Sequence, residues 1–271
     1  MKNTIIVLLI ISLLTIITYK LTYIKDMIII PVFEQNNNIF EFIDFYKDNN
    51  LSRYNNYKKN HPELNNKDIV LRVNIGLDNP FYTNSKEIKD FNMLMIINKY
   101  NYVSNTFTPN NLVLVDSYAK DNMYLVEECK NAFINMAYHA EIEGYHIRAI
   151  STYRTIEYQD KLFNDYVKKD GIEKAETYSA RPGFSEHHTG LAIDIDNIKL
   201  SYNNFENTPE FTWMNNNAYK YGFILRYPKD TTITGYIYEP WHYRYVGIEI
   251  AKYIYEHNIT YEEYYYEFID K

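Results

Sequence analysis

The stretch SEHHTGLAID, residues 185–194, is the most informative part of the chain when it is taken together with the later run EPWH, which ends at His242. The first run places His187 seven residues before Asp194, and the second places Glu239 three residues before His242. Two histidines and one aspartate are a ligand set that suits Zn2+ and leaves a fourth position for water. A glutamate close to one ligand is the usual general base at such a site. The two runs therefore indicate metal-assisted hydrolysis.

The spacing within each run constrains the local backbone. Residues an odd number of positions apart point to opposite faces of a regular strand, so His187 and Asp194 cannot both reach one metal from a straight strand. Gly190, between them, allows the necessary turn. Glu239 and His242 have a spacing that would suit a helix, but the proline between them removes a backbone donor and the flanking residues are typical of strands. We therefore expect an irregular backbone between Glu239 and His242.

The composition favours an ordinary globular protein. The 271 residues suffice for one large domain or two small ones, and 46% of them are hydrophobic. The net charge of -7 argues against nucleic-acid binding and against electrostatic capture by an anionic membrane or wall polymer. The single cysteine, Cys129, excludes a disulfide within the chain and a cysteine-based zinc cluster. Helical spacing places Cys129 with Leu125, Phe133 and Met136 on one apolar face, which predicts a buried thiol.

The N-terminus carries a second strong signal. Thr4 to Thr18 is a charge-free apolar run preceded by Lys2, and with the residues that follow it approaches the length of a membrane span. We expect residues 1–25 to form an uncleaved signal-anchor helix that attaches the protein to the membrane, because no small-residue cleavage site is evident before Lys25. Cleavage and secretion are the alternative. Charge does not determine the orientation, because lysines flank both ends of the run.

Beyond the anchor, the pattern divides loosely near residue 115. Residues 26–115 form a small N-terminal extension or stalk, in which we expect a helix at 39–46 and strands at 67–73, 94–97 and 112–115. Residues 116–271 form the larger domain. Its expected helices are 122–142, 155–169, 172–178, 213–221 and 246–256, and its expected strands are 146–151, 191–195, 223–226 and 236–245. Helices come first and strands mostly later, which predicts an α+β fold with an antiparallel sheet.

Further motifs accompany the two opening runs. They are STYRT at residues 151–155, SARPG at 179–183, YGFILRYP at 221–228 and EPWHYRYVG at 239–247. In this order the motifs resemble those of the LAS family, named for lysostaphin, D-Ala-D-Ala peptidases and sonic hedgehog. More narrowly, roughly residues 120–250 resemble the VanY-type D-alanyl-D-alanine carboxypeptidases and their LD-carboxypeptidase relatives. The resemblance implies a LAS/hedgehog-like antiparallel sheet flanked by helices, behind the N-terminal anchor and extension.

The resemblance also implies roles for particular residues. His187, Asp194 and His242 would bind Zn2+, and Glu239 would take a proton from the attacking water and deliver it to the leaving amine. Arg154 would stabilise the scissile carbonyl oxygen as negative charge develops on it. The remaining candidates would hold the substrate's peptide or terminal carboxylate, or form a wall of the pocket: Gln159, Ser179, Ser185 and Trp241.

Two neighbours of the proposed ligands have competing interpretations. Asp196 lies two residues after Asp194 and faces the same way along a strand, but motif spacing favours Asp194 as the ligand. His188 directly follows His187 and is expected to point elsewhere, at the pocket rim or the surface. A further set of arginines and histidines is expected to be structural or solvated: Arg148, Arg226, Arg244, His61, His139, His146 and His257.

These features predict a zinc-dependent D-alanyl-D-alanine carboxypeptidase that removes the C-terminal D-alanine from peptidoglycan stem peptides. The anchor would hold it, as a monomer, on the outer side of the cell membrane, where that substrate lies. The motifs do not distinguish this activity from LD-cleavage of tetrapeptide stems. A peptidoglycan endopeptidase and a non-catalytic wall-binding module are further alternatives. The presence of both Glu239 and Arg154 argues against the last of these.

Overall fold

The computed structural model describes residues 38–197 and 202–270. Residues from Phe42 onward belong to one compact unit, which holds both opening motifs, and the expected boundary near residue 115 lies inside it. The expected signal-anchor, residues 1–25, lies outside the described residues. Within the described ranges, no helix combines the length and the apolar character that crossing a bilayer requires.

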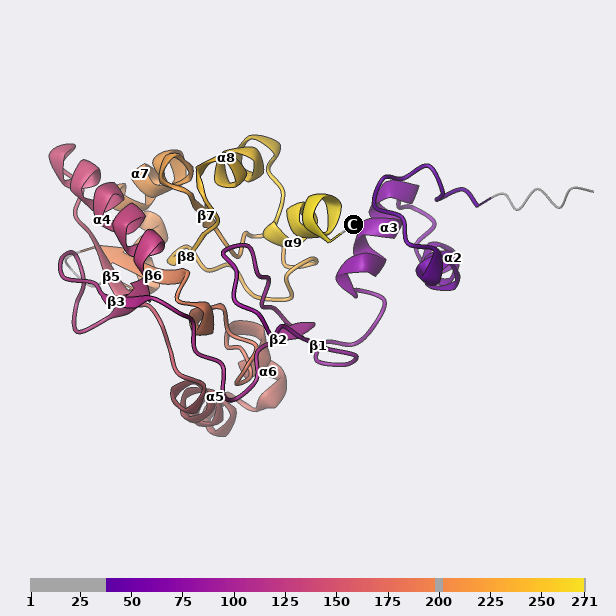
Figure 1. The fold of residues 1–271 in the computed structure, drawn as a ribbon, viewed down its shortest axis with the longest axis horizontal. Coiled ribbons are helices and arrows are strands. Elements are labelled where there is room, and N and C mark those ends of the chain that lie inside the picture. The colour runs from indigo at the N-terminus through magenta and orange to yellow at the C-terminus, as the bar shows by residue number, and fades with distance from the viewer. Residues whose placement is uncertain (1–37, 198–201, 271) are drawn as a thin grey trace, which may run out of the picture. The chain divides into compact units, whose positions relative to one another are not determined.

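A four-stranded antiparallel sheet is the framework of this unit (Figure 1). Its strands, in spatial order, are β5 (Ile147–Ser151), β6 (Ala192–Asn197), β8 (His242–Tyr245) and β7 (Phe223–Leu225). Every residue of β6 and β8 is buried. The antiparallel sheet that the sequence predicts is therefore confirmed. Its two inner strands carry two of the proposed ligands, Asp194 and His242.

Helices make up much of the rest of this unit. They are α4 (Glu127–Ile142), α5 (Ile156–Asp170), α6 (Ile172–Tyr178), α7 (Pro209–Asn217), α8 (Ile248–His257) and the short α9 (Tyr261–Tyr264), with 3-10 helices at Tyr202–Asn207 and Ala218–Tyr221 and a π-helical turn at Tyr265–Ile269. Phe133 and Met136 of α4 lie in one core cluster with the apolar residues of β5 and β6. Cys129 belongs to the same cluster and is 0% exposed, so the predicted buried thiol is confirmed, and burial raises its pKa.

Residues 42–126 join this framework through short elements. They are the 3-10 turn Asp48–Asn50, α2 (Leu51–Asn60), α3 (Asn66–Ile75), β1 (Lys86–Glu87), β2 (Asn101–Tyr102), β3 (Leu112–Leu114) and β4 (Tyr124–Val126). β1 pairs in parallel with β2, and β3 pairs antiparallel with β4. Backbone hydrogen bonds tie this segment to three of the motifs: Val103 N donates to Gly183 O, Val126 N donates to Gly190 O, and Tyr153 N donates to Tyr124 O. The segment therefore supports the same backbone that carries the first ligand.

The expected strand at residues 67–73 is wrong, because these residues lie in helix α3. The Asn65 side chain caps the helix by accepting a hydrogen bond from Asp68 N, and Gly76 ends it with a left-handed conformation at φ 107°. The helix-capping residues at the two ends of the segment thus favour a helix more strongly than its β-branched residues favour a strand. The expected helix at residues 39–46 is also wrong, since these residues form turns. The Asn38 side chain accepts a hydrogen bond from Phe40 N there, which favours a turn.

Three elements differ from expectation because other contacts use their backbone groups. Residues 94–97 are irregular rather than a strand, and the Arg244 guanidinium donates to the nearby carbonyls of Met93 and Met95. α4 begins at Glu127 rather than at residue 122, because β4 pairs with β3 first. The expected strand at 236–245 is reduced to β8. Ahead of β8, His242 N donates to the carbonyl of residue 239, so the irregular backbone expected there is confirmed.

Gly190→Ala is expected to destabilise the fold by roughly 2 kcal/mol or more. Gly190 has φ 67°, and a Cβ there would lie 2.8 Å from Leu112 Cδ2 and 3.3 Å from Val126 N. Gly144→Ala is the matched control, because Gly144 also has a positive φ, 86°, but has no atom within 4 Å of the added carbon. Urea unfolding measures the free energy of unfolding of both variants. Gly144→Ala reports backbone strain alone, and Gly190→Ala reports strain plus a steric clash. Equal losses in the two variants would contradict the clash.

Candidate active site

Local geometry turns the first motif so that its two ligands face one point. The 3-10 turn η2 (Glu186–Thr189) carries His187, and the Ser185 hydroxyl caps the turn by accepting a hydrogen bond from His187 N. Gly190 then adopts a left-handed conformation that leads the chain into β6. The turn that the odd spacing of His187 and Asp194 requires is therefore present, and it ends at Gly190 as expected.

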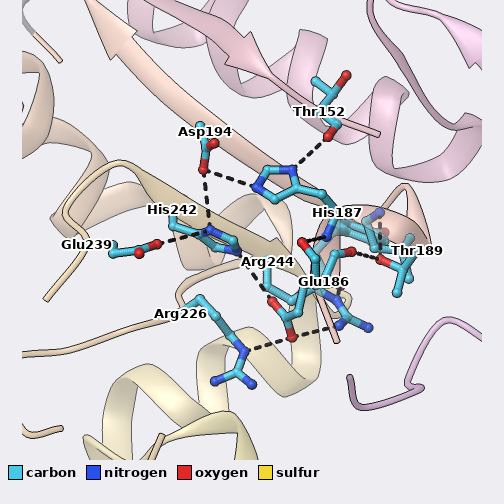
Figure 2. A network of polar contacts seen from close by, with 12 residues as sticks. Thr152, Glu186, His187, Thr189, Asp194, Arg226, Glu239, His242 and Arg244 are labelled. Carbon is cyan, nitrogen blue, oxygen red and sulfur yellow. Dashed lines mark hydrogen bonds and ion pairs between the residues drawn. The ribbon is translucent and has the colours of Figure 1, made fainter. Parts of the chain in front are cut away.

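The second motif meets the first across the β6–β8 pair. Asp194 lies directly opposite His242 in the antiparallel register. Asp194 Oδ1 is 3.3 Å from His187 Nε2 and 3.3 Å from His242 Nδ1 (Figure 2). One donor atom from each of the three residues lies within 4.8 Å of the others, and all three residues are buried. The structure thus brings the three proposed ligands together in one cluster.

The donor atoms of this cluster suit a zinc ion. His187 Nδ1 lies 2.7 Å from Thr152 O, so Nδ1–H donates to that carbonyl and Nε2 keeps its lone pair for a metal. Neither His187 Nε2 nor Asp194 Oδ1 makes a hydrogen bond, although both atoms are buried. Buried polar atoms without partners are costly. A cation that prefers nitrogen and oxygen ligands would satisfy both atoms.

The buried charges of the cluster influence one another strongly. Burial, together with the nearby Arg154 guanidinium, lowers the pKa of His187 to about 4. Burial disfavours the charged form of Asp194, but His187 and Arg154 outweigh this effect and hold the pKa of Asp194 well below its usual range. Burial also disfavours protonated His242, yet the neighbouring carboxylates raise the pKa of His242 well above its usual range. Negative charge at the cluster therefore favours a cation, whether a proton or a metal.

Glu239 stands beside the cluster, in the turn that precedes β8. Its Oε2 lies 3.3 Å from His242 Nδ1, the nitrogen that faces Asp194 (Figure 2). Burial raises the pKa of Glu239. A carboxylate whose pKa is raised takes up a proton more readily near neutral pH than an exposed one does. The position and the environment of Glu239 therefore suit a general base.

Arg154 connects the cluster to the pocket in front of it. Its Nη2 donates to Asp194 Oδ2 at 2.6 Å and to Ser151 Oγ at 2.7 Å, and its Nε donates to the same hydroxyl at 2.9 Å. Its Nη1 lies 3.5 Å from Gln159 Oε1, and the side chain keeps 19% of its surface exposed. The guanidinium is thus fixed in place while part of it faces the pocket. A fixed cation is what a developing oxyanion requires.

One pocket brings together all the site residues that the sequence predicts. Gln159 Nε2 donates to Ala180 O at 2.8 Å and to Ser179 Oγ at 3.3 Å, which orders one wall. Trp241 lines the pocket next to the ligand that follows it in sequence. The predicted residues in the lining are Arg154, Gln159, Ser179, Ser185, His187, Asp194, Glu239, Trp241 and His242. The lining also contains four tyrosines that the sequence did not single out, Tyr166, Tyr178, Tyr227 and Tyr236, together with Leu162, Ala180 and Glu186.

Two residues that contact the proposed zinc ligand His242 were not predicted from the sequence. The ring centroid of Tyr227 lies 4.8 Å from that of His242, and Glu186 Oε2 lies 3.5 Å from His242 Nε2. Glu186 lies in the motif SEHHTGLAID and Tyr227 lies in the motif YGFILRYP, so their place within a motif was the available signal. Arg226 and Arg244, which were expected to be structural, are fully buried and pair with Glu186, so this expectation is confirmed.

His188 corrects an expectation, because it lies neither at the rim nor at the surface. The residue is 1% exposed. Its Nδ1 lies 2.8 Å from Arg154 O, and its Nε2 accepts a hydrogen bond from Gly183 N at 3.2 Å. Burial lowers the pKa of His188 to about 4, which favours the neutral ring that these two bonds need. His188 therefore braces the backbone of Arg154 from inside the protein.

Comparisons with known proteins agree with this site. The family model VanY, D-alanyl-D-alanine carboxypeptidase, matches residues 122–248. The putative carboxypeptidase YodJ of Bacillus subtilis (strain 168) is 40% identical over 183 residues, which are 64% of this chain and 67% of YodJ. A D-alanyl-D-alanine carboxypeptidase of Enterococcus faecalis (strain ATCC 700802 / V583) is 42% identical over 137 residues, 46% of this chain and 49% of that protein. The chain thus spans about two thirds of the first relative and about half of the second.

Solved structures show the same likeness. The LD-carboxypeptidase LdcB has a TM-score of 0.63 and 38% identity, covering 68% of this chain and 91% of that chain. A mutant of the vancomycin-resistance D,D-pentapeptidase VanY, in complex with Zn(II), has a TM-score of 0.56 and 32% identity, covering 64% of this chain and 98% of that chain. The buried His–Asp–His cluster and these likenesses define a zinc metallopeptidase. The chain belongs to the VanY family of D-alanyl-D-alanine carboxypeptidases.

Proposed function

We propose that this chain removes the C-terminal D-alanine from peptidoglycan stem peptides that end in D-Ala-D-Ala. The main support for the proposal is the position of a carboxylate and a guanidinium next to the His–Asp–His cluster. Glu239 lies 3.3 Å from one ligand, His242, and Arg154 lies 2.6 Å from another, Asp194. Peptide hydrolysis needs a base for the water and a cation for the carbonyl oxygen, and both are present. The activity named for the Enterococcus faecalis relative supports this choice of substrate.

The chain's own residues divide the work of the reaction. A zinc ion held by His187, Asp194 and His242 would supply Lewis acidity and would make water a better nucleophile. Glu239 takes a proton from the attacking water, because burial raises its pKa, and passes the proton to the nitrogen of the leaving D-alanine. Arg154, held by Asp194 and Ser151, stabilises the negative charge that develops on the scissile carbonyl oxygen.

Two serines are placed to bind the terminal carboxylate of the substrate. Ser179 Oγ accepts a hydrogen bond from Gln159 Nε2 at 3.3 Å, and Ser185 Oγ accepts one from His187 N at 3.3 Å. Each hydroxyl therefore keeps its own hydrogen for donation to an anion in the pocket. Both residues line the pocket that contains the ligands.

The zinc-loaded full chain is expected to release D-alanine from a pentapeptide ending in D-Ala-D-Ala at least about tenfold faster than from the matched tetrapeptide. The two substrates differ in the residue on the amino side of the scissile bond, which is D-alanine in the pentapeptide and an L-centre in the tetrapeptide, and the activity named for the Enterococcus faecalis relative is for D-Ala-D-Ala. Mass spectrometry of released D-alanine measures both rates. A chelator serves as the control and should stop release from either peptide.

LD-carboxypeptidase activity is the second candidate, because the likeness to LdcB has the higher TM-score, 0.63 against 0.56. Chelator-sensitive release from the tetrapeptide alone would establish that activity and overturn the first. Cleavage of cross-linked dimers alone would establish an endopeptidase. Absence of chelator-sensitive cleavage of all three substrates would contradict an enzymatic role and favour wall binding.

We further propose that the chain acts as a monomer on the outer side of the cell membrane, held there by residues 1–25. The support is the charge-free apolar run from Thr4 to Thr18 together with the location of peptidoglycan. Protease added to intact cells tests this proposal. Protection of the whole chain, or its recovery in the cytosol, would contradict it, and size-exclusion chromatography tests the monomer.

A further inference from the structure

A buried group of four charges lies next to the zinc ligand His242. It consists of Glu186, Arg226, Arg244 and Glu262, and we call it the four-charge cluster (Figure 2 labels its first three members). Each of these residues is at most 1% exposed. Two carboxylates balance two guanidinium groups, so the cluster is neutral as a whole. The reaction proposed above assigns no step to any of its members.

Glu186 divides its carboxylate between the arginines and the zinc ligand. Its Oε1 accepts hydrogen bonds from Arg226 Nε at 2.8 Å and from Arg244 Nη1 at 3.0 Å. Its Oε2 lies 3.5 Å from His242 Nε2. Both of these last atoms are buried, and neither makes a hydrogen bond elsewhere. The free oxygen of Glu186 therefore faces the free nitrogen of His242, as Figure 2 shows.

The orientation of the His242 ring determines what its contact with Glu186 can do. His242 presents Nδ1 to Asp194 and to Glu239, at 3.3 Å from each, so Nε2 is the nitrogen left over. A ligating imidazole is neutral and carries its hydrogen on the nitrogen that does not bind the metal. For His242 this hydrogen must sit on Nε2, opposite to the arrangement in His187, where Nδ1 donates to Thr152 O. An acceptor that faces Nε2 stabilises the tautomer that leaves the Nδ1 lone pair for zinc.

We propose that Glu186 is a positioning residue for the metal: its Oε2 accepts the Nε2 hydrogen of His242 and thereby holds the Nδ1 lone pair of His242 toward zinc. Arg226 and Arg244 hold the other oxygen of Glu186, so the carboxylate cannot turn away. The proposal rests on zinc binding by the His–Asp–His cluster and is independent of which peptide the enzyme cuts. Glu186 acts through His242 rather than on the substrate.

Glu262 provides a matched comparison within the same cluster. It comes from α9, outside the residues that the family model matches. Its carboxylate accepts hydrogen bonds from Arg226 Nη1 at 2.8 Å, from Arg226 Nη2 at 2.7 Å and from Asn98 Nδ2 at 3.2 Å. Within the described part of the chain, none of its hydrogen bonds or ion pairs reaches His242. Loss of Glu262 thus removes the same charge from the same arginine without touching the ligand.

Zinc dissociation constants distinguish a positioning role of Glu186 from a role in ion pairing with the arginines alone. They are measured for the parent, Glu186→Gln and Glu262→Gln by competition with a chromophoric chelator, after circular dichroism has verified folding. Glu186→Gln is expected to weaken zinc binding about 10- to 100-fold, the usual effect of removing a residue that orients a metal ligand. Glu262→Gln is expected to leave zinc affinity at the parent value while it lowers the urea midpoint, because Arg226 loses a buried partner.

Each other result would overturn the positioning role. Parent-like zinc affinity in Glu186→Gln would show that the carboxylate facing His242 does not control zinc binding. Equal weakening in both variants would show that charge balance in the cluster, rather than the contact with His242, controls zinc binding. A parent that binds no zinc would overturn the zinc site itself, which is a different failure from that of Glu186.

A measurement on the parent decides the matter if Glu186→Gln does not fold. NMR of the histidine ring nitrogens in the zinc-loaded protein is expected to show hydrogen on Nε2 of His242 and on Nδ1 of His187. The His242 hydrogen should exchange slowly with water, because Glu186 accepts it in a buried position. Hydrogen on Nδ1 of His242, or rapid exchange of its Nε2 hydrogen, would overturn the proposal.

Discussion

Asp194→Asn is expected to abolish both zinc binding and peptide cleavage. Asp194 Oδ1 lies 3.3 Å from a nitrogen of each ligand histidine, so its carboxylate supplies a ligand together with negative charge for the cation. Asparagine keeps the shape but removes the charge, and Arg154 loses the carboxylate that it contacts at 2.6 Å. The zinc dissociation constant should rise by more than the roughly 100-fold that loss of an orienting partner can cost. Chelator competition measures this rise, and D-alanine release should be undetectable.

Asp196→Asn is the matched control for that prediction. Asp196 lies on the same strand two residues later and is 0% exposed, against 3% for Asp194. Its Oδ1 accepts a hydrogen bond from Asn197 N at 2.7 Å, and burial raises its pKa, so a neutral side chain is well tolerated there. The variant should keep zinc and activity. Loss of zinc in both variants would mean that Asp194→Asn acts by damaging β6 rather than by removing a ligand.

The ligand geometry was predictable because it depends on residues that are neighbours in sequence. The seven-residue spacing of His187 and Asp194 excludes one straight strand, and the structure has a 3-10 turn that Gly190 ends at φ 67°. In the same way, the proline after Glu239 predicts a break in the strand, and a turn precedes β8. Such features follow from local sterics and hydrogen bonding, which a single sequence records directly.

Contacts between distant residues explain what the sequence could not predict. The apolar run at residues 94–97 has the composition of a strand, yet Arg244, from β8, donates to carbonyls at its start and leaves it irregular. His188 is buried because Gly183 N and Arg154 O both bond to its ring. The importance of Glu186 likewise depends on partners that come much later in the chain, which are Arg226, His242 and Arg244. One sequence shows the types of these residues but not which of them meet.

Glu239→Gln is expected to lower kcat for D-alanine release by roughly 10³-fold while the protein keeps its zinc. The Glu239 carboxylate enters from the turn before β8 and lies 3.3 Å from His242 Nδ1, close to where water must be activated. Glutamine fills the same space but cannot accept the proton, so the chemical step slows and KM changes little. The three ligands remain in place. Rate measurements over a range of substrate concentrations give kcat and KM, and chelator competition gives zinc affinity.

Glu239→Asp tests whether Glu239 acts as a base that must reach the water or contributes only its negative charge. Aspartate keeps the acid and the charge but draws the carboxylate back by one methylene, away from its position beside His242. A base that must reach the water loses part of its rate when it is withdrawn, so Glu239→Asp should fall between the parent and Glu239→Gln. If Glu239→Gln kept the parental kcat, another group would have to move the proton, and the assignment of Glu239 as the base would be wrong. A joint loss of zinc and rate would instead give Glu239 a part in holding the metal.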